Sequence, residues 1–267
     1  MRRIAQLSDL HFGRIAEGTC ASLQRVLERL QPDLVIVSGD LTQRARAVQF
    51  RDARQFLARL PQPVLCVPGN HDVPLYDVFR RLLNPLARYR HWISQQVDAF
   101  YEDETLSVAA LNTAHGWTSM HGRITTAQCD AVERHFGSSP GRLRMVVTHH
   151  PLDLPPTDAH PVPVRARARL PHWIDELRVD MFLAGHLHRS RVLLGPVRVR
   201  ARRRAIFTQA GTSTSDRHSG YGNAFNFLRV QPDAVHLEHW HADAPGDDFS
   251  VRGSARFTRC AQGWQAA

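Results

Sequence analysis

The sequence contains no lysine, only four cysteines and no long apolar run. All 34 basic residues are therefore arginine, and with 25 acidic residues they give a net charge of +9 and a pI near 10.5. Cys20, Cys66, Cys129 and Cys260 lie far apart without a C-x-x-C pair, which argues against a disulfide framework and against a zinc knuckle. No stretch approaches the roughly 18 consecutive apolar residues of a membrane span.

The N-terminal sequence MRRIAQLSDLHFG passes from two arginines directly into a strand-like segment, with no room for a signal peptide. We therefore expect a cytoplasmic protein. The basic charge indicates anionic partners but does not choose among nucleotides, nucleic acid and lipid headgroups. A chain of 267 residues with 43% hydrophobic residues is globular, and it is long enough for one large domain or for a domain with a cap.

Short apolar runs alternate with segments of helical spacing along most of the chain. The predicted strands are residues 3–8, 34–38, 64–67, 106–111, 143–148 and 180–184, and the predicted helices are residues 21–30, 47–60 and 126–136. After residue 201, strands at 206–209, 224–230 and 235–241 follow one another without helices, which predicts a second sheet facing the first. The sequence thus predicts an α/β protein, a four-layer α/β/β/α sandwich of two facing mixed sheets.

Two segments interrupt this alternation. Residues 73–100 carry apolar side chains at helical steps around Pro85 and predict a small helical cap. Residues 151–171 contain six prolines and the run RARAR, which predicts a long Pro/Arg-rich loop. We expect one domain over residues 1–245, including both segments, and a C-terminal tail or edge strand over 246–267. The run VRVRARRR at 197–204 has period two and predicts a strand whose arginines face solvent.

Acidic and imidazole side chains gather where the predicted strands end. Ligands of open α/β sheets bind beyond the carboxyl ends of the strands, so residues far apart in sequence meet there. The sequence therefore predicts one site. The residues concerned are Asp9 and His11, Asp40, Asn70 to Asp72, His149 and His150, and His186 and His188.

The metal-binding part of this site consists of two carboxylates, one amide oxygen and four imidazoles. This mixture suits Mn, Fe, Zn or Co and contains too much nitrogen for Ca or Mg alone. Seven ligands exceed the needs of one tetrahedral ion but serve two ions if one carboxylate bridges them. Two ions roughly 3.5–4 Å apart activate water and stabilise both oxygens of a phosphoryl displacement. Phosphate ester hydrolysis is the predicted reaction.

Five motifs, in this order, resemble those of the calcineurin-like metallophosphoesterase superfamily. They are D-x-H at 9–11, GD at 39–40, GNHD at 69–72, THHP at 148–151 and GHLH at 185–188. The resemblance implies a metallophosphoesterase-like sandwich with a binuclear metal centre. It also implies His71 as the catalytic residue that touches the substrate phosphate or protonates the leaving oxygen. The implied ligands are Asp9, His11 and His188 for one ion, Asn70, His149 and His186 for the other, and Asp40 as the bridge.

Three further residues are expected beside the centre. His150 lines the pocket or supports a ligand, and Asp72 accepts a hydrogen bond that orients an imidazole. Arg44, in the loop LTQRA after Asp40, either meets the phosphate or base of the substrate or is an exposed loop residue.

Within the superfamily the chain is most similar to the class III cyclic nucleotide phosphodiesterases, which implies hydrolysis of a small phosphodiester such as 3',5'-cyclic AMP. An alternative is an enzyme like the UDP-diacylglucosamine pyrophosphohydrolases, whose cap would lie on an anionic membrane. The best-known enzymes of that kind carry arginine where His71 stands. A nuclease agrees with the charge, but the chain leaves little room for a DNA-binding domain. Some proteins of this fold are binding scaffolds that have lost ligands, whereas all seven ligands and His71 are present here.

Overall fold

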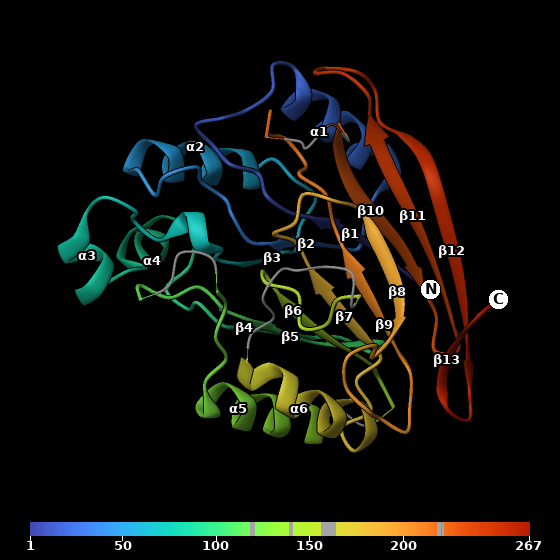
Figure 1. Ribbon diagram of the computed structural model, residues 1–267. Coiled ribbons are helices and arrows are strands. Elements are labelled where there is room, and N and C mark those ends of the chain that lie inside the picture. Colours follow the sequence, from blue (N-terminus) through green and yellow to red (C-terminus); the bar gives the residue numbers. More distant parts are fainter. Residues whose placement is uncertain (118–120, 139–140, 156–163, 218–219, 221) are drawn as a thin grey trace.

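The computed structural model describes residues 1–267 except 118–120, 139–140, 156–163, 218–219 and 221. Two mixed β-sheets face each other between two pairs of helices (Figure 1). Helices α1 (Thr19–Leu30) and α2 (Ala47–Leu57) cover one sheet, and α5 (Thr126–Gly137) and α6 (Val164–Asp175) cover the other. The predicted α/β/β/α sandwich is therefore confirmed.

The first sheet has the strand order β13-β12-β11-β10-β1-β2-β3. Its three N-terminal strands are parallel, and the C-terminal strands extend it from β1 in antiparallel pairs. The bounds are β1 (Arg2–Leu7), β2 (Leu34–Ser38), β3 (Val64–Val67), β10 (Asn223–Val230), β11 (Ala234–Ala242), β12 (Ser250–Cys260) and β13 (Gly263–Ala266).

The second sheet has the order β4-β5-β6-β7-β9-β8. Strands β5, β6, β7 and β9 are parallel, and antiparallel β4 and β8 form its two edges. The bounds are β4 (Ala99–Glu102), β5 (Leu106–Leu111), β6 (Leu143–Thr148), β7 (Met181–Ala184), β8 (Arg191–Gly195) and β9 (Ala205–Gln209).

The core has three layers because successive side chains of a strand point to opposite faces of its sheet. In β1, Ile4 packs between the two sheets, whereas Ala5 and Leu7 pack beneath α1 and α2. Strand β2 is buried along its whole length, as expected of a parallel strand covered on both faces. A third apolar cluster lies between the second sheet and helices α5 and α6.

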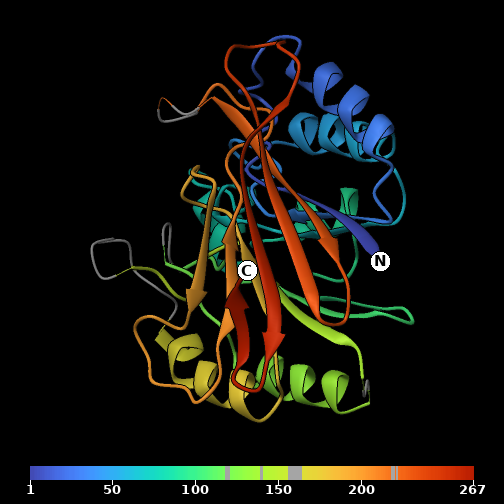
Figure 2. The same cartoon turned by 90° about the vertical axis from the view of Figure 1, so that its right-hand side faces the viewer.

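The expectation of a separate sheet after residue 201 is wrong. Strand β9 joins the second sheet beside β7, whereas β10 to β13 extend the first sheet. The pairing of β10 with β1 sets Leu228 opposite Ile4. It joins the N-terminal strand and the C-terminal strands in one open sheet. Residues 250–266 of the expected tail are edge strands of that sheet, on the side that faces the viewer in Figure 2.

Two Arg-rich segments differ from their predicted structures. The run RARAR lies in α6, where Leu170, Trp173 and Ile174 are buried against the second sheet, so one apolar face stabilises a helix that contains Pro171. The run at 197–204 is a loop rather than a strand. Several of its backbone N–H groups donate to side-chain carboxylates, as in Arg198 to Asp153 and Arg202 to Asp175, and its last residue, Arg204, forms an isolated bridge to Gly263 of β13.

The expected cap contains two short helices, α3 (Val78–Leu83) and α4 (Ala87–Trp92). Leu86 and Tyr89 are buried in the core, whereas α3 has no buried residue. Phe79 and Leu83 on α3 are each 83% exposed, because no other described element covers this helix. None of the helices in the described part of the chain is long and apolar enough to cross a membrane.

Candidate metal centre

The predicted site residues meet at the carboxyl ends of the parallel strands of both sheets. Asp9 follows β1, Asp40 follows β2 and Asn70 follows β3, while His149 and His186 follow β6 and β7. Five site residues have left-handed backbone conformations, with φ between 50° and 72°: Asp9, His11, Asp40, His186 and His188. A non-glycine residue in this conformation costs about 1–3 kcal/mol and occurs mainly at functional sites.

Two motif glycines allow the loops to approach each other. A Cβ atom on Gly69 would overlap Oδ1 of Asp40, and a Cβ on Gly185 would overlap the hydroxyl of Ser8. That hydroxyl donates to Oδ2 of Asp9 at 2.6 Å. Glycine is therefore required at both positions for the acidic side chains to enter the site.

One group of potential ligands surrounds Asp9. Nε2 of His188 lies 3.2 Å and Nε2 of His11 lies 3.7 Å from Oδ1 of Asp9, and the two Nε2 atoms are 3.1 Å apart. The carboxylate and the His11 ring are completely buried. These three ligand atoms can surround one cation.

A second group surrounds Asn70. Its Oδ1 lies 3.0 Å from Nε2 of His149 and 3.1 Å from Nδ1 of His186. Oδ2 of Asp40 lies 3.3 Å from Nε2 of His149 and 3.8 Å from Nε2 of His11. Asp40 is therefore placed between the two groups.

The hydrogen bonds of these residues fit a bound cation. His149 donates from Nδ1 to the carbonyl of Ser38 at 2.8 Å, so in the neutral ring its Nε2 carries a lone pair that faces Oδ1 of Asn70, another acceptor. Oδ1 of Asp9 is buried without a hydrogen-bond partner among the described residues. Buried acceptors that face one another are unfavourable unless a cation or a proton lies between them.

The comparisons with known proteins agree with this geometry. The family model "Calcineurin-like phosphoesterase" matches residues 2–190, the part that carries all five motifs. The chain belongs to the calcineurin-like phosphoesterase family. It is therefore a metal-dependent phosphoesterase, and its family uses divalent metal ions.

The chain is similar to two proteins of named activity and to one solved structure. The chain is 24% identical over 218 residues to the 3',5'-cyclic adenosine monophosphate phosphodiesterase CpdA of Escherichia coli, covering 70% of each chain. It is 32% identical over 77 residues to the UDP-2,3-diacylglucosamine pyrophosphatase LpxG of Chlamydia muridarum, covering 28% of this chain and 23% of that one. The fold is similar to that of purple acid phosphatase PPD1 from yellow lupin, with a TM-score of 0.74, 14% identity, and coverage of 98% of this chain and 54% of that one.

The electrostatics of this phosphoesterase follow from the crowding of charges in its centre. Burial opposes ionisation of Asp40, but the surrounding imidazoles, His149 first, hold the pKa of its carboxyl well below the usual range. Burial also opposes protonation of His149, but Asp40 outweighs it and raises the pKa of His149 to about 9. Burial and the charge of His149 lower the pKa of His186 to about 4. The carboxylates thus attract positive charge, which a cation would supply in place of protons.

His71 lies at the edge of the centre. Its backbone N–H donates to Oδ1 of Asp40 at 2.8 Å, and its ring meets the His11 ring edge-on at 4.8 Å between centroids. Nδ1 donates to the carbonyl of Gln43 at 2.9 Å, so Nε2 is the acceptor of the neutral ring, and Nη1 of Arg217 lies 3.0 Å from it. Burial first, then the charges of His11 and Arg217, lower its pKa despite the opposing influence of Asp40.

Asp72 is expected from the sequence to orient an imidazole, but its hydrogen bonds in the described part of the chain go to other groups. Its carboxylate accepts backbone N–H groups of Leu41, Thr42 and Gly69 at 2.8–3.1 Å and so joins the loops after β2 and β3. Burial and the nearby Asp40 raise its pKa to about 7. Its contribution to the centre is to hold the loop that carries Asp40.

The other two predicted neighbours, His150 and Arg44, lie beside the centre. His150 shares a 2.7 Å hydrogen bond between Nδ1 and the hydroxyl of Thr113, and its ring packs on that of His186 at 4.6 Å between centroids. Arg44 is half-buried, with Nη1 3.3 Å from Nδ1 of His71. It faces the site and is not an exposed loop residue.

The segment GTSTSDR at 211–217 was missed from the sequence. It follows β9, a parallel strand, so the rule that located the other ligands at strand ends also applies to it. Its last residue, Arg217, accepts Nδ1–H of His188 on its carbonyl at 2.9 Å. Its side chain reaches His71, with Nη1 3.0 Å from Nε2. The one carboxylate of the segment, Asp216, pairs with Arg14, and an arginine belongs to no metal-ligand pattern, so sequence reasoning gave no signal for Arg217.

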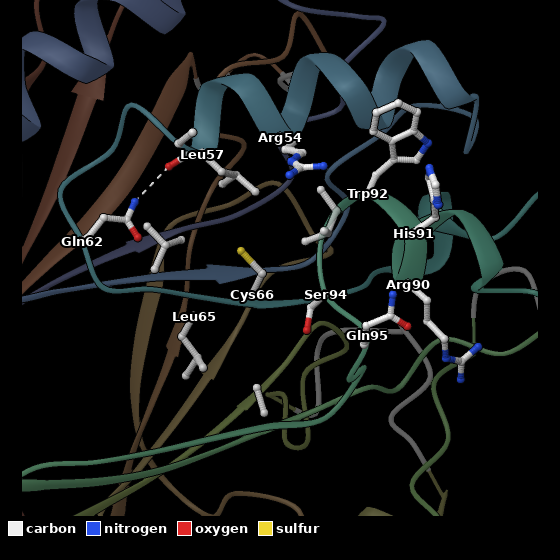
Figure 3. A pocket seen from close by; sticks show the side chains of 14 residues that line it. Arg54, Leu57, Gln62, Leu65, Cys66, Arg90, His91, Trp92, Ser94 and Gln95 are labelled. Atoms are coloured by element: carbon white, nitrogen blue, oxygen red, sulfur yellow. Dashed lines mark hydrogen bonds between the residues drawn. The ribbon is translucent and has the colours of Figure 1, made fainter.

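A surface pocket of about 460 Å³ lies elsewhere, between α2, α4 and β3, and none of the predicted site residues lines it (Figure 3). Arg54, Arg90 and Trp92 surround it, and no carboxylate is among its lining residues. Burial, and then the charge of Asp72, raise the pKa of the Cys66 thiol in its lining to about 12, which disfavours the reactive thiolate.

Proposed function

We propose that this phosphoesterase is a binuclear phosphodiesterase whose main substrate is a 3',5'-cyclic nucleotide such as cyclic AMP. The position of Asp40 between two groups of ligands, with His71 beside it, carries the proposal. The similarity to a relative named for cyclic AMP hydrolysis supports the substrate class.

The ions are Mn, Fe, Zn or Co, as the mixed nitrogen and oxygen ligands suggest. Such ions supply an activated water and neutralise charge on the phosphoryl group when they are bound. The proposed ligands are Asp9, His11 and His188 for one ion, Asn70, His149 and His186 for the other, and Asp40 for both.

The protein's own residues orient these ligands and the substrate. Ser38 and Arg217 accept the Nδ1–H groups of His149 and His188, which leaves each Nε2 available as a ligand. Asp40 holds the backbone of His71 in place. Nε2 of His71 then faces the reacting phosphate, where its imidazolium form would donate a proton to the leaving oxygen.

The test is metal analysis of the purified protein followed by a substrate panel with added Mn. The panel contains bis(p-nitrophenyl) phosphate, cyclic nucleotides, glycerophosphodiesters, a nucleoside-diphosphate-linked lipid and single-stranded DNA. We expect hydrolysis of the generic diester and the highest kcat/KM on a cyclic nucleotide. Preference for another member of the panel would replace the proposed substrate but leave the phosphoesterase assignment intact.

A lipid-linked substrate is a second candidate because of the exposed apolar residues of the cap. Phe79 and Leu83 on α3 are each 83% exposed and Tyr76 before it is 77% exposed, in a segment that directly follows the His71 turn. Clustered exposed apolar side chains are typical of membrane or lipid contact. The partial similarity to an enzyme named for UDP-2,3-diacylglucosamine agrees with this candidate.

Vesicle flotation distinguishes the two candidates. A lipid substrate predicts binding to phosphatidylglycerol vesicles that the double variant Phe79→Ser, Leu83→Ser abolishes. The matched control is Val251→Ser, at a residue 45% exposed on β12. Absence of vesicle binding by the parent protein would remove this candidate.

A further inference from the structure

The segment 210–217 is a rigid part of the centre rather than a connecting loop. It runs beside the loop that carries Asp9 and His11, and backbone hydrogen bonds join Ser213 to Ser8 and Ala16 to Thr214 at 2.8–2.9 Å. The hydroxyls of Thr212 and Thr214 donate to the carbonyls of Asp9 and Leu10 at 2.6 and 2.7 Å.

Its four hydroxyl residues, 212 to 215, have no exposed surface. Buried hydrogen bonds of this kind fix a segment in one conformation. The residue that the segment presents to the site, Arg217, is thereby placed precisely.

The backbone of Arg217 is fixed at both of its polar groups. Its N–H donates to the hydroxyl of Ser215 at 3.1 Å, and its carbonyl accepts the proton of His188. The side chain reaches residues that follow β2 and β3, with Nη1 3.3 Å from Oε1 of Gln43 and 3.0 Å from Nε2 of His71. Arg217 therefore connects the ligand groups of both sheets.

The guanidinium groups of Arg217 and Arg44 approach the same imidazole: Nη1 of Arg217 lies 3.0 Å from Nε2 and 3.5 Å from Nδ1 of His71, and Nη1 of Arg44 lies 3.3 Å from Nδ1. Among the described residues, all their side-chain contacts use Nη1 alone, so Nη2 and Nε of both have no hydrogen-bond partner. No ion pair within the described part of the chain neutralises either arginine; the neighbouring Asp216 pairs with Arg14 instead. Two cations held together without an anion repel each other, and an oxyanion between them removes that cost.

We propose that Arg217, with Arg44, binds the non-bridging oxygens of the substrate phosphate beside His71. The free edge of a guanidinium presents two parallel N–H groups, which match two oxygens of one phosphate. This inference rests on the proposed phosphoesterase site but not on the cyclic nucleotide as its substrate. It makes Arg217 a substrate-binding residue, supplied by a segment outside the five motifs.

The test measures inorganic phosphate binding by calorimetry on the metal-loaded protein. Arg217→Ala should weaken phosphate binding about 10- to 100-fold, the loss expected for hydrogen bonds to a charged group, with metal content unchanged. Arg217→Lys should recover only part of the affinity because lysine lacks the planar fork. Guanidinium ion added to Arg217→Ala should lower KM for bis(p-nitrophenyl) phosphate. Arg25→Ala, at an exposed arginine paired with exposed Asp248, is the control and should bind phosphate as the parent does.

Two results would overturn the inference. Phosphate affinity of Arg217→Ala within twofold of the parent would exclude a binding role. Loss of metal together with phosphate affinity would make Arg217 a support for His188 only. With either result, a parent protein that hydrolyses cyclic AMP is still the proposed phosphodiesterase. If the parent does not hydrolyse cyclic AMP but Arg217→Ala weakens phosphate binding as expected, only the cyclic nucleotide is removed from the proposed function.

Discussion

Two groups of buried polar residues lie close together in this fold, and their hydrogen bonds differ. Between the sheets, Gln6, Asn226 and His239 form a cross-strand row on β1, β10 and β11. Asn226 donates to Oε1 of Gln6 at 2.9 Å and accepts Nδ1–H of His239 at 2.7 Å. Gln6 also accepts the hydroxyl of Thr208 from the second sheet at 2.7 Å. We call these four residues the polar seam.

In the metal centre, at the strand ends, several buried polar atoms are not paired by hydrogen bonds with one another. There Oδ1 of Asp9, Nδ1 of His11 and Nε2 of His150 are buried without hydrogen-bond partners among the described residues. A polar cluster whose members pair with one another stabilises the fold, whereas one that leaves buried polar atoms unpaired, such as the Asp9 oxygen, is arranged for a ligand. We expect changes in the centre to affect chemistry, and changes in the polar seam to affect stability.

The largest effect is expected for Asp40→Ala. Removal of the proposed bridge should lower metal content and reduce activity on bis(p-nitrophenyl) phosphate by roughly 10³-fold or more, since charge stabilisation by the ions is worth several kcal/mol. Without metal, the variant should also be less stable than the metal-free parent at neutral pH, because Asp40 accepts the His71 N–H and is the counter-charge of the buried, protonated His149. Two metals per chain and full turnover in this variant would refute the binuclear assignment.

His71→Ala should separate chemistry from metal binding. We expect unchanged metal content and a loss of about 10²- to 10⁴-fold in kcat, the usual contribution of a positioned proton donor. The loss should be smaller for a p-nitrophenolate leaving group than for an alkoxide, because the better leaving group needs less protonation. Equal losses for both leaving groups would favour phosphate positioning by His71 over proton donation.

Much of the fold could be predicted because the decisive patterns are local. The strands at 34–38, 64–67, 106–111 and 143–148 have the predicted bounds, since apolar runs between turn residues leave little freedom. The partner of β9 could not be predicted, because strand pairing depends on contacts between distant segments. The loop at 197–204 was misread because Asp153 and Asp175, far away in sequence, accept its backbone N–H groups.

The same distinction applies to the site. The metal-ligand pattern could be located from residue type and strand ends, and the structure brings those residues together. Arg217 could not be located in this way, because an arginine matches no metal-ligand pattern. Only the folded chain shows that its side chain reaches His71. The opposite error occurred at Asp72, whose residue type suggested an imidazole partner while its position after β3 gives it backbone N–H groups.

Asn226→Ala tests the polar seam. The substitution removes the donor to Gln6 and the acceptor of His239, and it leaves the carbonyl of the buried Gln209 without the Asn226 amide. We expect the free energy of unfolding to fall by about 1–3 kcal/mol, the cost of unsatisfied buried polar groups. Metal content and kcat of the folded variant should stay near those of the parent. If activity fell instead and stability did not, the division between the two regions would be wrong.

The smallest effect concerns the pH dependence of stability, through His239. Burial and the neighbouring His241 lower the pKa of His239 from its ordinary 6.5 to about 4. The unfolded chain therefore binds a proton at this residue between pH 6.5 and 4 that the native state does not bind, so stability falls as the pH falls through this window. Allowing for partial solvent screening, we expect this residue to contribute a loss of about 1–2 kcal/mol.

The variant His239→Gln isolates this contribution. Glutamine keeps an N–H donor for Oδ1 of Asn226 but does not titrate, so the variant should lose less stability than the parent between pH 7.5 and 4.5 in urea unfolding of the metal-free proteins. The comparison at pH 7.5, where both side chains are neutral, reports the packing cost of the substitution alone. The histidines of the metal centre are present in both proteins and cancel in the difference. If the free energies of unfolding of parent and variant changed in parallel with pH, His239 would be solvated in the native state. The polar seam would then accept a proton at this residue, as the metal centre does at its own histidines.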